Sequence, residues 1–237
     1  MNKKKFSIII PALNEEKQIF QVIESLKKQT IDRDLFEIIV VDNNSTDKTF
    51  ECATTAGADK VIKEIIKGTN IARQRGVNES NGEIIAFLDA DCIAPEDWLA
   101  KIESNLSKEN VLVSGPYEHN FTGLTKHLDY IYHHYMFPVI PKILQGIFRK
   151  KAGIIVEGNF ATWRYAIDKI GGLPPIVFYG DGPAIAMLIS RKVGKIYFDN
   201  NMYVQTSARR FKKNVFMPVI RYAVAYLKMY FAKEYWS

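Results

Sequence analysis

The sequence has little cysteine and no long hydrophobic run. Its only two cysteines, Cys52 and Cys92, cannot form the disulfide framework of a small secreted domain or the cysteine pairs of a structural zinc site. We therefore expect a reducing compartment, the cytoplasm. A membrane-spanning helix needs about 18 uninterrupted apolar residues, and no segment reaches that length. The apolar run at residues 6–10 stops at Pro11 and is too short for a signal peptide, so we expect none.

Acidic residues are slightly fewer than basic residues. The 32 Lys and Arg against 26 Asp and Glu give a net charge of +6, and the excess lies late in the chain beside apolar residues. Nucleic-acid binding needs a basic face with exposed aromatics, so we expect no nucleic-acid partner. The chain of 237 residues is 47% hydrophobic and 24% charged, which excludes a disordered protein and suits one large domain with a buried core.

The spacing of apolar residues predicts an α/β fold. Continuous β-branched and aromatic runs are typical of strands buried on both faces, and they occur at residues 6–10, 37–42, 84–88, 111–113, 154–156 and 196–198. Helical spacing predicts helices at residues 15–29, 47–56, 70–79 and 95–106, with Asn14 as N-cap of the first and Pro95 in the first turn of the last. The alternation predicts a Rossmann-like three-layer α/β/α domain with a mostly parallel sheet, which binds ligands at the carboxyl ends of its strands.

The later part of the chain is richer in aromatic and basic residues. We expect a long helical stretch at residues 123–151, broken at Pro138 and Pro141, and an amphipathic helical segment near the C-terminus. Such segments suit helices that lie in a membrane interface, and the positive charge suits an anionic surface. Packing on the sheet or a homodimer contact explains the same residues equally well. His133 and His134 can be read as metal ligands, but Asp129 is the only acid four residues from His133. We therefore assign both histidines to packing or an interface and leave them out of the site.

Polar side chains follow the first, second and third of the early strands. Helix capping can explain Asn14 and Asp47 but not Asp42. Asp89 and Asp91 follow a buried strand and are separated by one small residue, so both carboxylates can coordinate one hard cation. Mg²⁺ or Mn²⁺ shared with a diphosphate is the chemistry that this spacing favours, and capping of the helix near residue 95 is the alternative.

Four strings, SIIIPALNEE, VVDNNSTDKT, GTNIARQRG and FLDAD, stand in an order and spacing that resemble family 2 glycosyltransferases with the GT-A fold. The resemblance implies a GT-A domain over residues 1–211, with a nucleotide-binding half at 1–115 and an acceptor half at 116–211, followed by the amphipathic segment at 212–237. It implies that Asp91 is the main metal ligand and that Asp89 touches ribose and metal. The implied donor site consists of Pro11, Ala12, Asn14, Glu15, Asp42, Asn44, Arg73, Asp89, Ala90, Asp91, Arg209 and Arg210.

The same resemblance implies an acceptor segment and a catalytic base. It implies that Asp181 is the base, and an N-cap role is the alternative. Gly180 stands where the family often has a glutamate, so a second carboxylate is missing there. The cluster at residues 209–213 can close over the diphosphate or simply be a solvated charge run. The segment that resembles the acceptor side begins at Glu157 and ends at Trp163. The implied acceptor residues in it are Gly158, Asn159, Phe160 and Trp163, of which the two aromatics can equally be core residues.

The expected function is metal-assisted transfer of one sugar, with inversion, from a UDP- or GDP-sugar to a hydroxyl or lipid-linked acceptor. The Gln-x-x-Arg-Trp signature of processive synthases is absent, which favours a single transfer. Such an enzyme could lie peripherally on the inner face of the membrane. One alternative is a non-catalytic module that binds sugar nucleotides or a partner on the same fold. A sugar-phosphate nucleotidyltransferase is a third candidate, but it needs a glycine-rich loop where Pro11 and Ala12 follow the first strand.

Overall fold

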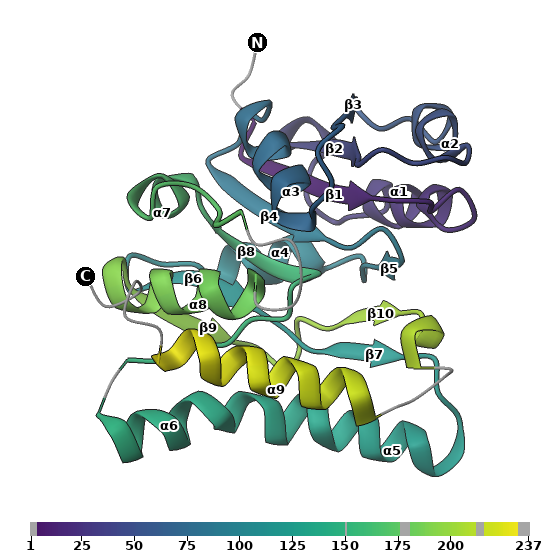
Figure 1. The fold of residues 1–237 in the computed structure, drawn as a ribbon. Helices are drawn as coiled ribbons and strands as arrows, with labels where there is room; N and C mark the ends of the chain where they lie inside the picture. Colours follow the sequence, from purple (N-terminus) through teal and green to yellow (C-terminus); the bar gives the residue numbers. More distant parts are fainter. Residues whose placement is uncertain (1–3, 150, 176–180, 212–215, 232–237) are drawn as a thin grey trace.

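The computed structural model describes residues 4–149, 151–175, 181–211 and 216–231, without the side chains of residues 210–222. A seven-stranded sheet in the order β3-β2-β1-β4-β8-β6-β9 forms the middle layer (Figure 1). The first half alternates strands and helices, as predicted. Its elements are β1 (Phe6–Ala12), α1 (Ile19–Lys27), a 3-10 turn (Arg33–Leu35), β2 (Phe36–Asp42), α2 (Thr49–Thr55), β3 (Lys60–Lys63), α3 (Thr69–Asn78) and β4 (Ile84–Leu88).

The second half adds two strands to the sheet beside β4, a further strand at its edge and a helical layer below it. Its elements are β5 (Cys92–Ile93), α4 (Trp98–Asn105), β6 (Asn110–Ser114), β7 (Tyr117–His119), α5 (Gly123–Ile131), α6 (Ile140–Phe148), β8 (Asn159–Trp163), α7 (Arg164–Lys169), α8 (Asp181–Lys192), β9 (Lys195–Phe198), β10 (Val204–Thr206), a 3-10 turn (Ala208–Phe211) and α9 (Phe216–Phe231).

The sheet has a core on each face because successive side chains of a strand point to opposite sides. In β1, Ile8 and Ile10 pack with α1, α2 and α4, whereas Ile9 packs with α3, α7 and α8. All three side chains are fully buried. Burial of one such side chain stabilises a fold by about 1.5 to 3 kcal/mol. The continuous isoleucine run is therefore what allows helices to cover both faces of the sheet.

The sheet is mostly parallel, and β8 is its exception. It runs antiparallel between β4 and β6, while the remaining paired strands are parallel. The strand expected at residues 154–156 is wrong, because Val156 makes only an isolated bridge to Asn159 and the strand itself begins at Asn159. Ile154 and Val156 instead pack against α9, and Ile155 packs against the sheet. Periodicity cannot distinguish a short buried strand from another buried apolar run.

Two helix starts differ from the expectation. Helix α1 begins at Ile19 after Gln18, and Asn14 is not its N-cap. Asn14 has a left-handed backbone (φ 57°), and its Oδ1 accepts a hydrogen bond from the Thr46 N–H at 2.8 Å. Pro95 lies before α4 rather than in its first turn, because that helix begins at Trp98. Asn14 thus connects two loops at the carboxyl edge of the sheet.

The long helical stretch expected after residue 123 is present, but the two prolines do not break it. A π turn (Tyr132–Met136) and a 3-10 turn (Phe137–Val139) join α5 to α6, and both prolines lie at the start of a helical segment. A proline there lacks only an N–H that would have no partner in the helix.

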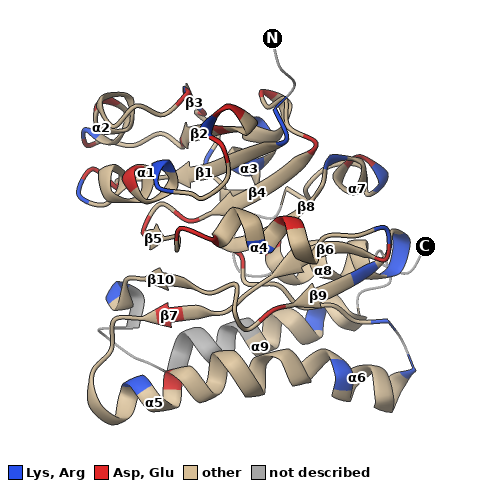
Figure 2. Ribbon diagram, turned by 180° about the vertical axis from the view of Figure 1, so that it is seen from behind, with Lys and Arg blue, Asp and Glu red and all other residues tan. Residues whose placement is uncertain are grey.

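Helix α9 lies beside this stretch (Figure 1, Figure 2). The buried Tyr226 and Tyr230 hold it in place, and their hydroxyls donate to the carbonyls of Gly153 at 2.8 Å and Leu144 at 3.3 Å. The C-terminal helix therefore packs on the domain through one face. In the part of the chain that the structure describes, no helix has the length and apolar character needed to cross a membrane.

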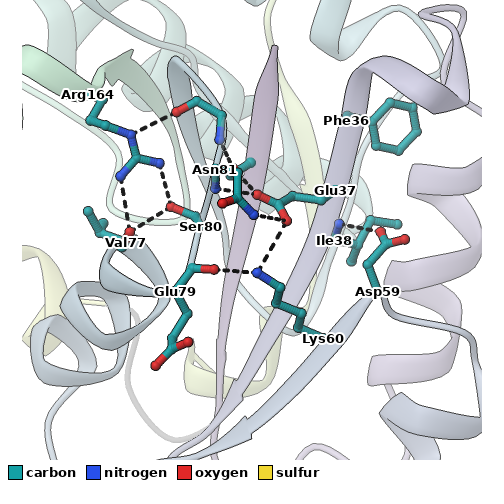
Figure 3. A network of polar contacts seen from close by, with 12 residues as sticks. Phe36, Glu37, Ile38, Asp59, Lys60, Val77, Glu79, Ser80, Asn81 and Arg164 are labelled. Carbon is teal, nitrogen blue, oxygen red and sulfur yellow. Dashed lines mark hydrogen bonds and ion pairs between the residues drawn. The ribbon is translucent and has the colours of Figure 1, made fainter. Parts of the chain in front are cut away.

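A polar network fastens the amino ends of the strands, the edge opposite to the expected site (Figure 3). The buried Glu37 carboxylate accepts hydrogen bonds from the Ser7 hydroxyl and the Asn81 N–H, both at 2.6 Å. Arg164 donates to the carbonyls of Gly82 at 2.9 Å and Val77 at 3.1 Å. These bonds connect β1, β2 and the segment between α3 and β4. The polar contacts that stabilise the amino edge of the sheet therefore use different residues from the expected site at the carboxyl edge.

Candidate active site

A three-stranded sheet, β5-β10-β7, assembles the site from distant segments. Strand β10 pairs antiparallel with β5 and parallel with β7. Asp91 directly precedes β5, Tyr117 begins β7 and Arg209 follows β10. The small sheet therefore brings these three side chains to the carboxyl end of β4, as Figure 1 shows for the strands.

Arg73 of α3 is the centre of the site. Its side chain is only 1% exposed, and it donates to Asp181 Oδ2 at 3.1 Å, Asp89 Oδ1 at 3.2 Å and the Glu157 carbonyl at 2.8 Å. Burial lowers the pKa of the guanidinium, but the neighbouring carboxylates outweigh burial and raise it. The Nε atom of Arg73 is buried without a hydrogen-bond partner among the described residues. Arg73 therefore neutralises and spaces the carboxylates around it.

Asp89 is held in one orientation from both sides. Its Oδ1 accepts from Arg73, and its Oδ2 accepts from the Tyr117 hydroxyl at 2.9 Å. The same Tyr117 oxygen accepts from the Gly158 N–H at 2.8 Å. A Cβ on Gly158 would lie 2.3 Å from Asp89 Cγ, so this position has room only for glycine. The expected acceptor residue Gly158 thus acts as a support for Asp89.

Asp91 and Glu15 both pair with one arginine side chain, Arg209. The Arg209 guanidinium donates to Glu15 Oε1 at 2.6 Å and to Asp91 Oδ2 at 3.1 Å. The Glu15 hydrogen bond is the main reason that the pKa of Arg209 is raised. Glu15 Oε2 is buried without a partner among the described residues. Arg209 therefore lies beside the acidic pair, and the side chain of Arg210 is outside the described residues.

Glu157 begins the segment that resembles the family's acceptor side, but we gave it no role of its own from the sequence. Burial and the charge of Asp181 raise the pKa of Glu157 well above its ordinary value, although Arg73 opposes the shift. The Glu157 and Asp181 side chains are hydrogen-bonded to each other, and the Gly182 N–H donates to Glu157 Oε1 at 3.2 Å. The second carboxyl group that seemed missing at Gly180 is thus supplied by the segment before β8. Its place at the start of the expected acceptor segment was the signal in the sequence.

The remaining expected donor residues lie at the carboxyl edge of β1, β2 and β4. Asp42 ends β2, and its Oδ1 accepts from the Ser45 N–H at 3.0 Å, so it shapes the following turn. Asn44 is exposed with a left-handed backbone (φ 65°), and Asn14 faces the same loop. Ala90 is buried beside the acidic pair. The two residues at the end of β1 are Pro11, which is partly buried, and Ala12, which is buried.

Three of the expected acceptor residues are buried or lie at the end of β8 away from the site. Phe160 is fully buried, and its ring stacks on Phe87 at a centroid distance of 4.5 Å. Asn159 is also fully buried, with its Oδ1 accepting from Trp98 Nε1 at 2.8 Å. Trp163 pairs with the first residue of β4, whereas Asn159 pairs with the last, so Trp163 lies at the far end of the strand. Of the two alternatives for the aromatics, Phe160 is a core residue, and Trp163 is partly buried against the core at the end of β8 away from the site.

Comparison with known proteins agrees with this geometry. The fold and the site define an α/β protein with acidic groups at the carboxyl edge of its strands. Residues 7–171 match the model of glycosyl transferase family 2, so the chain belongs to this family of enzymes. It is 36% identical over 121 residues to the glycosyltransferase AglE of Haloferax volcanii, a match that covers 48% of this chain and 40% of that protein. A match to the glucosyl-3-phosphoglycerate synthase of Mycolicibacterium smegmatis has 36% identity over 97 residues and covers 38% of this chain and 32% of that protein.

Solved structures share the fold. The mannosyltransferase PcManGT from Pyrobaculum calidifontis, solved with GDP-Man and Mn²⁺, has a TM-score of 0.73 at 20% identity and covers 100% of this chain and 66% of that chain. Glucosyl-3-phosphoglycerate synthase from Mycobacterium tuberculosis, solved with Mn²⁺ and UDP-glucose, has a TM-score of 0.69 at 21% identity, over 95% of this chain and 79% of that chain. The fold is therefore the predicted GT-A fold. The matches span less than half the length of the two curated relatives described above.

Proposed function

We propose that this chain transfers one sugar, with inversion, from a UDP- or GDP-sugar to an acceptor hydroxyl. The observation that carries the proposal is that Arg73 pairs on one side with Asp89, two residues before Asp91, and on the other with Asp181, which lies beside Glu157. Inversion in one displacement needs a base at the acceptor oxygen and positive charge at the leaving diphosphate. The sugar nucleotides bound in the two solved structures, GDP-Man and UDP-glucose, support this donor class.

We assign the divalent cation, Mn²⁺ or Mg²⁺, to Asp91 and Asp89. Both offer the carboxylate oxygens that these hard cations prefer, and the unpartnered Glu15 Oε2 adds a buried acceptor beside Asp91. When bound, the cation neutralises the charge that develops on the leaving diphosphate. It would compete with Arg209 for Asp91, which would leave the partly exposed guanidinium available for phosphate oxygens.

Asp181 is the proposed base. It begins α8 and is 6% exposed, and Arg73 fixes its Oδ2. The acceptor O–H gives its proton to the Asp181 carboxylate while the oxygen bonds to the anomeric carbon and the bond to the diphosphate breaks. Glu157 holds its proton at a higher pH than an ordinary glutamate because of burial and the charge of Asp181, which raise its pKa. That proton serves the hydrogen bond to Asp181 and orients the base.

Calorimetry with UDP, GDP and their sugar conjugates, with and without Mn²⁺, tests the donor site. Asp91→Ala should abolish the metal-dependent part of nucleotide binding. Asp181→Asn should bind the donor as the unaltered chain does, but it should lose turnover by about 10² to 10⁴-fold if Asp181 is the base. Undiminished turnover in Asp181→Asn would contradict the assignment. Donor binding by the unaltered chain with no transfer to any acceptor would favour the binding-module alternative, and release of pyrophosphate from a nucleoside triphosphate and a sugar phosphate would favour nucleotidyl transfer.

The helical layer supports a lipid-linked acceptor and a peripheral position on an anionic membrane. Between residues 123 and 149 the only acidic side chain, Asp129, is 12% exposed, whereas Lys126, Lys142 and Arg149 are exposed. Figure 2 shows few charged positions along α5 and α6. Apolar surface with only cations around it fits an anionic lipid surface. We call these exposed side chains the apolar stripe: Leu124, Leu128, Ile131, Tyr135, Val139, Ile143 and Ile147.

Flotation with vesicles that contain phosphatidylglycerol tests this part of the proposal. The full chain should float with these vesicles at low salt and less with neutral ones. Ile147→Asp, on the apolar stripe, should abolish flotation, because Ile147 is 65% exposed and packing is spared. Ile65→Asp is the matched control, since Ile65 is 81% exposed and lies outside this layer. No association at low salt, or concentration-dependent dimerisation that Ile147→Asp removes, would overturn the membrane assignment.

A further inference from the structure

A cluster of imidazole and carboxylate groups lies under the small sheet, outside the donor site. His119 ends β7, and Asp129 and His133 are four residues apart on the helical stretch below, so they share one face. The Nδ1 atom of His119 lies 2.9 Å from Asp129 Oδ1, and His133 Nε2 lies 3.5 Å from the same oxygen. One ligand atom from each of the three residues falls within 4.8 Å of the others.

His133 adds a second, independent observation. It is 9% exposed, and its Nδ1 has no hydrogen-bond partner among the described residues. The nitrogen that faces Asp129 is the other one, Nε2, which is therefore the atom available to a cation. Burial is the main reason that the pKa of His133 is lowered to about 4, so the ring is neutral at pH 7. His133 also lies in the π turn, a helix irregularity that is frequent at functional sites.

The spacing suits a tetrahedral cation. With metal–ligand bonds of about 2.0 to 2.1 Å, neighbouring ligand atoms of a tetrahedral Zn²⁺ site are about 3.3 Å apart. The two distances of 2.9 and 3.5 Å around Asp129 bracket that value. Two imidazoles and one carboxylate form a ligand set that Zn²⁺ accepts and that Mg²⁺ does not prefer.

We propose that His119, Asp129 and His133 form a second cation site, which binds Zn²⁺ or a similar divalent transition metal. His119 and Asp129 also line a cavity of about 470 Å³, so the site has access for a water molecule as fourth ligand. The ring of Tyr117 lies 5.7 Å from the His119 ring and 6.1 Å from the His133 ring, measured between centroids. Because Tyr117 donates to Asp89 Oδ2, the bound cation would fasten the helical layer to β7 and thereby position Asp89.

Cobalt titration of the full chain, prepared without a histidine tag, tests the proposal. Excess Mg²⁺ occupies the carboxylate site, and Co²⁺ binding is followed by visible absorption, with Zn²⁺ as competitor. We expect one equivalent of Co²⁺ to bind and Zn²⁺ to displace it. His119→Gln and His133→Gln should each weaken binding by at least about tenfold, the least that loss of a supporting group costs. Asp129→Asn, a nearly isosteric change, is a third ligand variant in case a histidine variant does not fold.

Two control variants separate this site from other binding. His127 is exposed on the same helix and bonds to the Gly123 carbonyl, so His127→Gln should bind Co²⁺ as the unaltered chain does. Asp91→Asn should also retain the Co²⁺ signal, because it alters only the donor site. The proposal is overturned if the unaltered chain binds no Co²⁺ in Mg²⁺. It is also overturned if Asp91→Asn loses the signal, or if the folded variants of the three proposed ligands all keep it.

Discussion

Replacing Arg73 by methionine should destabilise this fold strongly, because three acidic residues face the one buried guanidinium. Arg73 is 1% exposed, and its ion-pair partners Asp89 and Asp181 have side chains that are 14% and 9% exposed. Methionine fills a similar volume but supplies no charge and no donor. The carboxylates of Asp89 and Asp181 would then stay together, beside the carboxyl group of Glu157, without a cation between them.

The magnitude follows from the burial. Removing one partner of a buried ion pair costs about 3 to 5 kcal/mol, because the remaining charge loses its compensation. Folded domains are stable by only about 5 to 15 kcal/mol, so the loss is a large fraction of the total. Arg75→Met is the matched control, two residues along the same helix. Arg75 is 46% exposed and pairs with the 41% exposed Glu79 at 3.0 Å, a surface contact that contributes about 0 to 1 kcal/mol.

Urea unfolding, followed by tryptophan fluorescence and circular dichroism, measures both variants. With a slope of about 1 to 3 kcal/mol per molar urea, Arg73→Met should lower the midpoint by more than about 1 M, and Arg75→Met should leave it nearly unchanged. The reasoning is refuted if the free energies of unfolding of the two variants differ by less than about 1 kcal/mol. That result would mean that the acidic residues relax away from one another without the guanidinium.

Two further predictions concern Glu157 and Gly158. The raised pKa of Glu157 means that the native state binds more protons than the unfolded chain. The contribution of Glu157 to stability is therefore full below pH ~4.3, and it declines as the pH rises toward the pKa of Glu157 in the folded state. Urea melts from pH 4 to 8 should therefore show Glu157→Gln gaining stability relative to the unaltered chain as pH rises. Glu109→Gln should show the opposite sign in melts extended to about pH 3, because Lys195 lowers the pKa of the exposed Glu109 and stabilisation by that ion pair is lost as pH falls below ~4.3. Gly158→Ala should displace Asp89 and weaken metal-dependent donor binding at least about tenfold in calorimetry. Gly146→Ala is the control, because a Cβ at this position in α6 meets open space. This variant should bind the donor normally, and its free energy of unfolding should rise by about 0.5 to 1 kcal/mol.

The first half of the fold was predictable because its signals are local. Isoleucine-rich runs and helical stripes predict β1, β2, β4 and the helices α1 to α4, and the acidic motifs follow directly after strands. The short strands β3 and β5 have no such run and were not predicted. The placement of Asp42, Asp89 and Asp91 at the carboxyl edge therefore needed no knowledge of packing. The second half was harder. The apolar run at residues 154–156 has strand-like composition, yet the strand starts at Asn159 because its pairing with β4 and β6 begins there.

The sequence by itself determined the strand–helix alternation and the family, because both depend on residues that are close in the chain. Only the tertiary structure decided which groups meet at Arg73. Arg73 donates hydrogen bonds to Glu157 and Asp181, which are 84 and 108 residues away along the chain. No local sequence pattern relates these residues to Arg73. The antiparallel insertion of β8 beside β4 brings Glu157 to the site, and it points the Phe160 ring into the core, where the ring stacks on Phe87. Packing of the helical layer under β7 likewise brings His119 to Asp129 and His133, since contacts between layers depend on how whole elements stack.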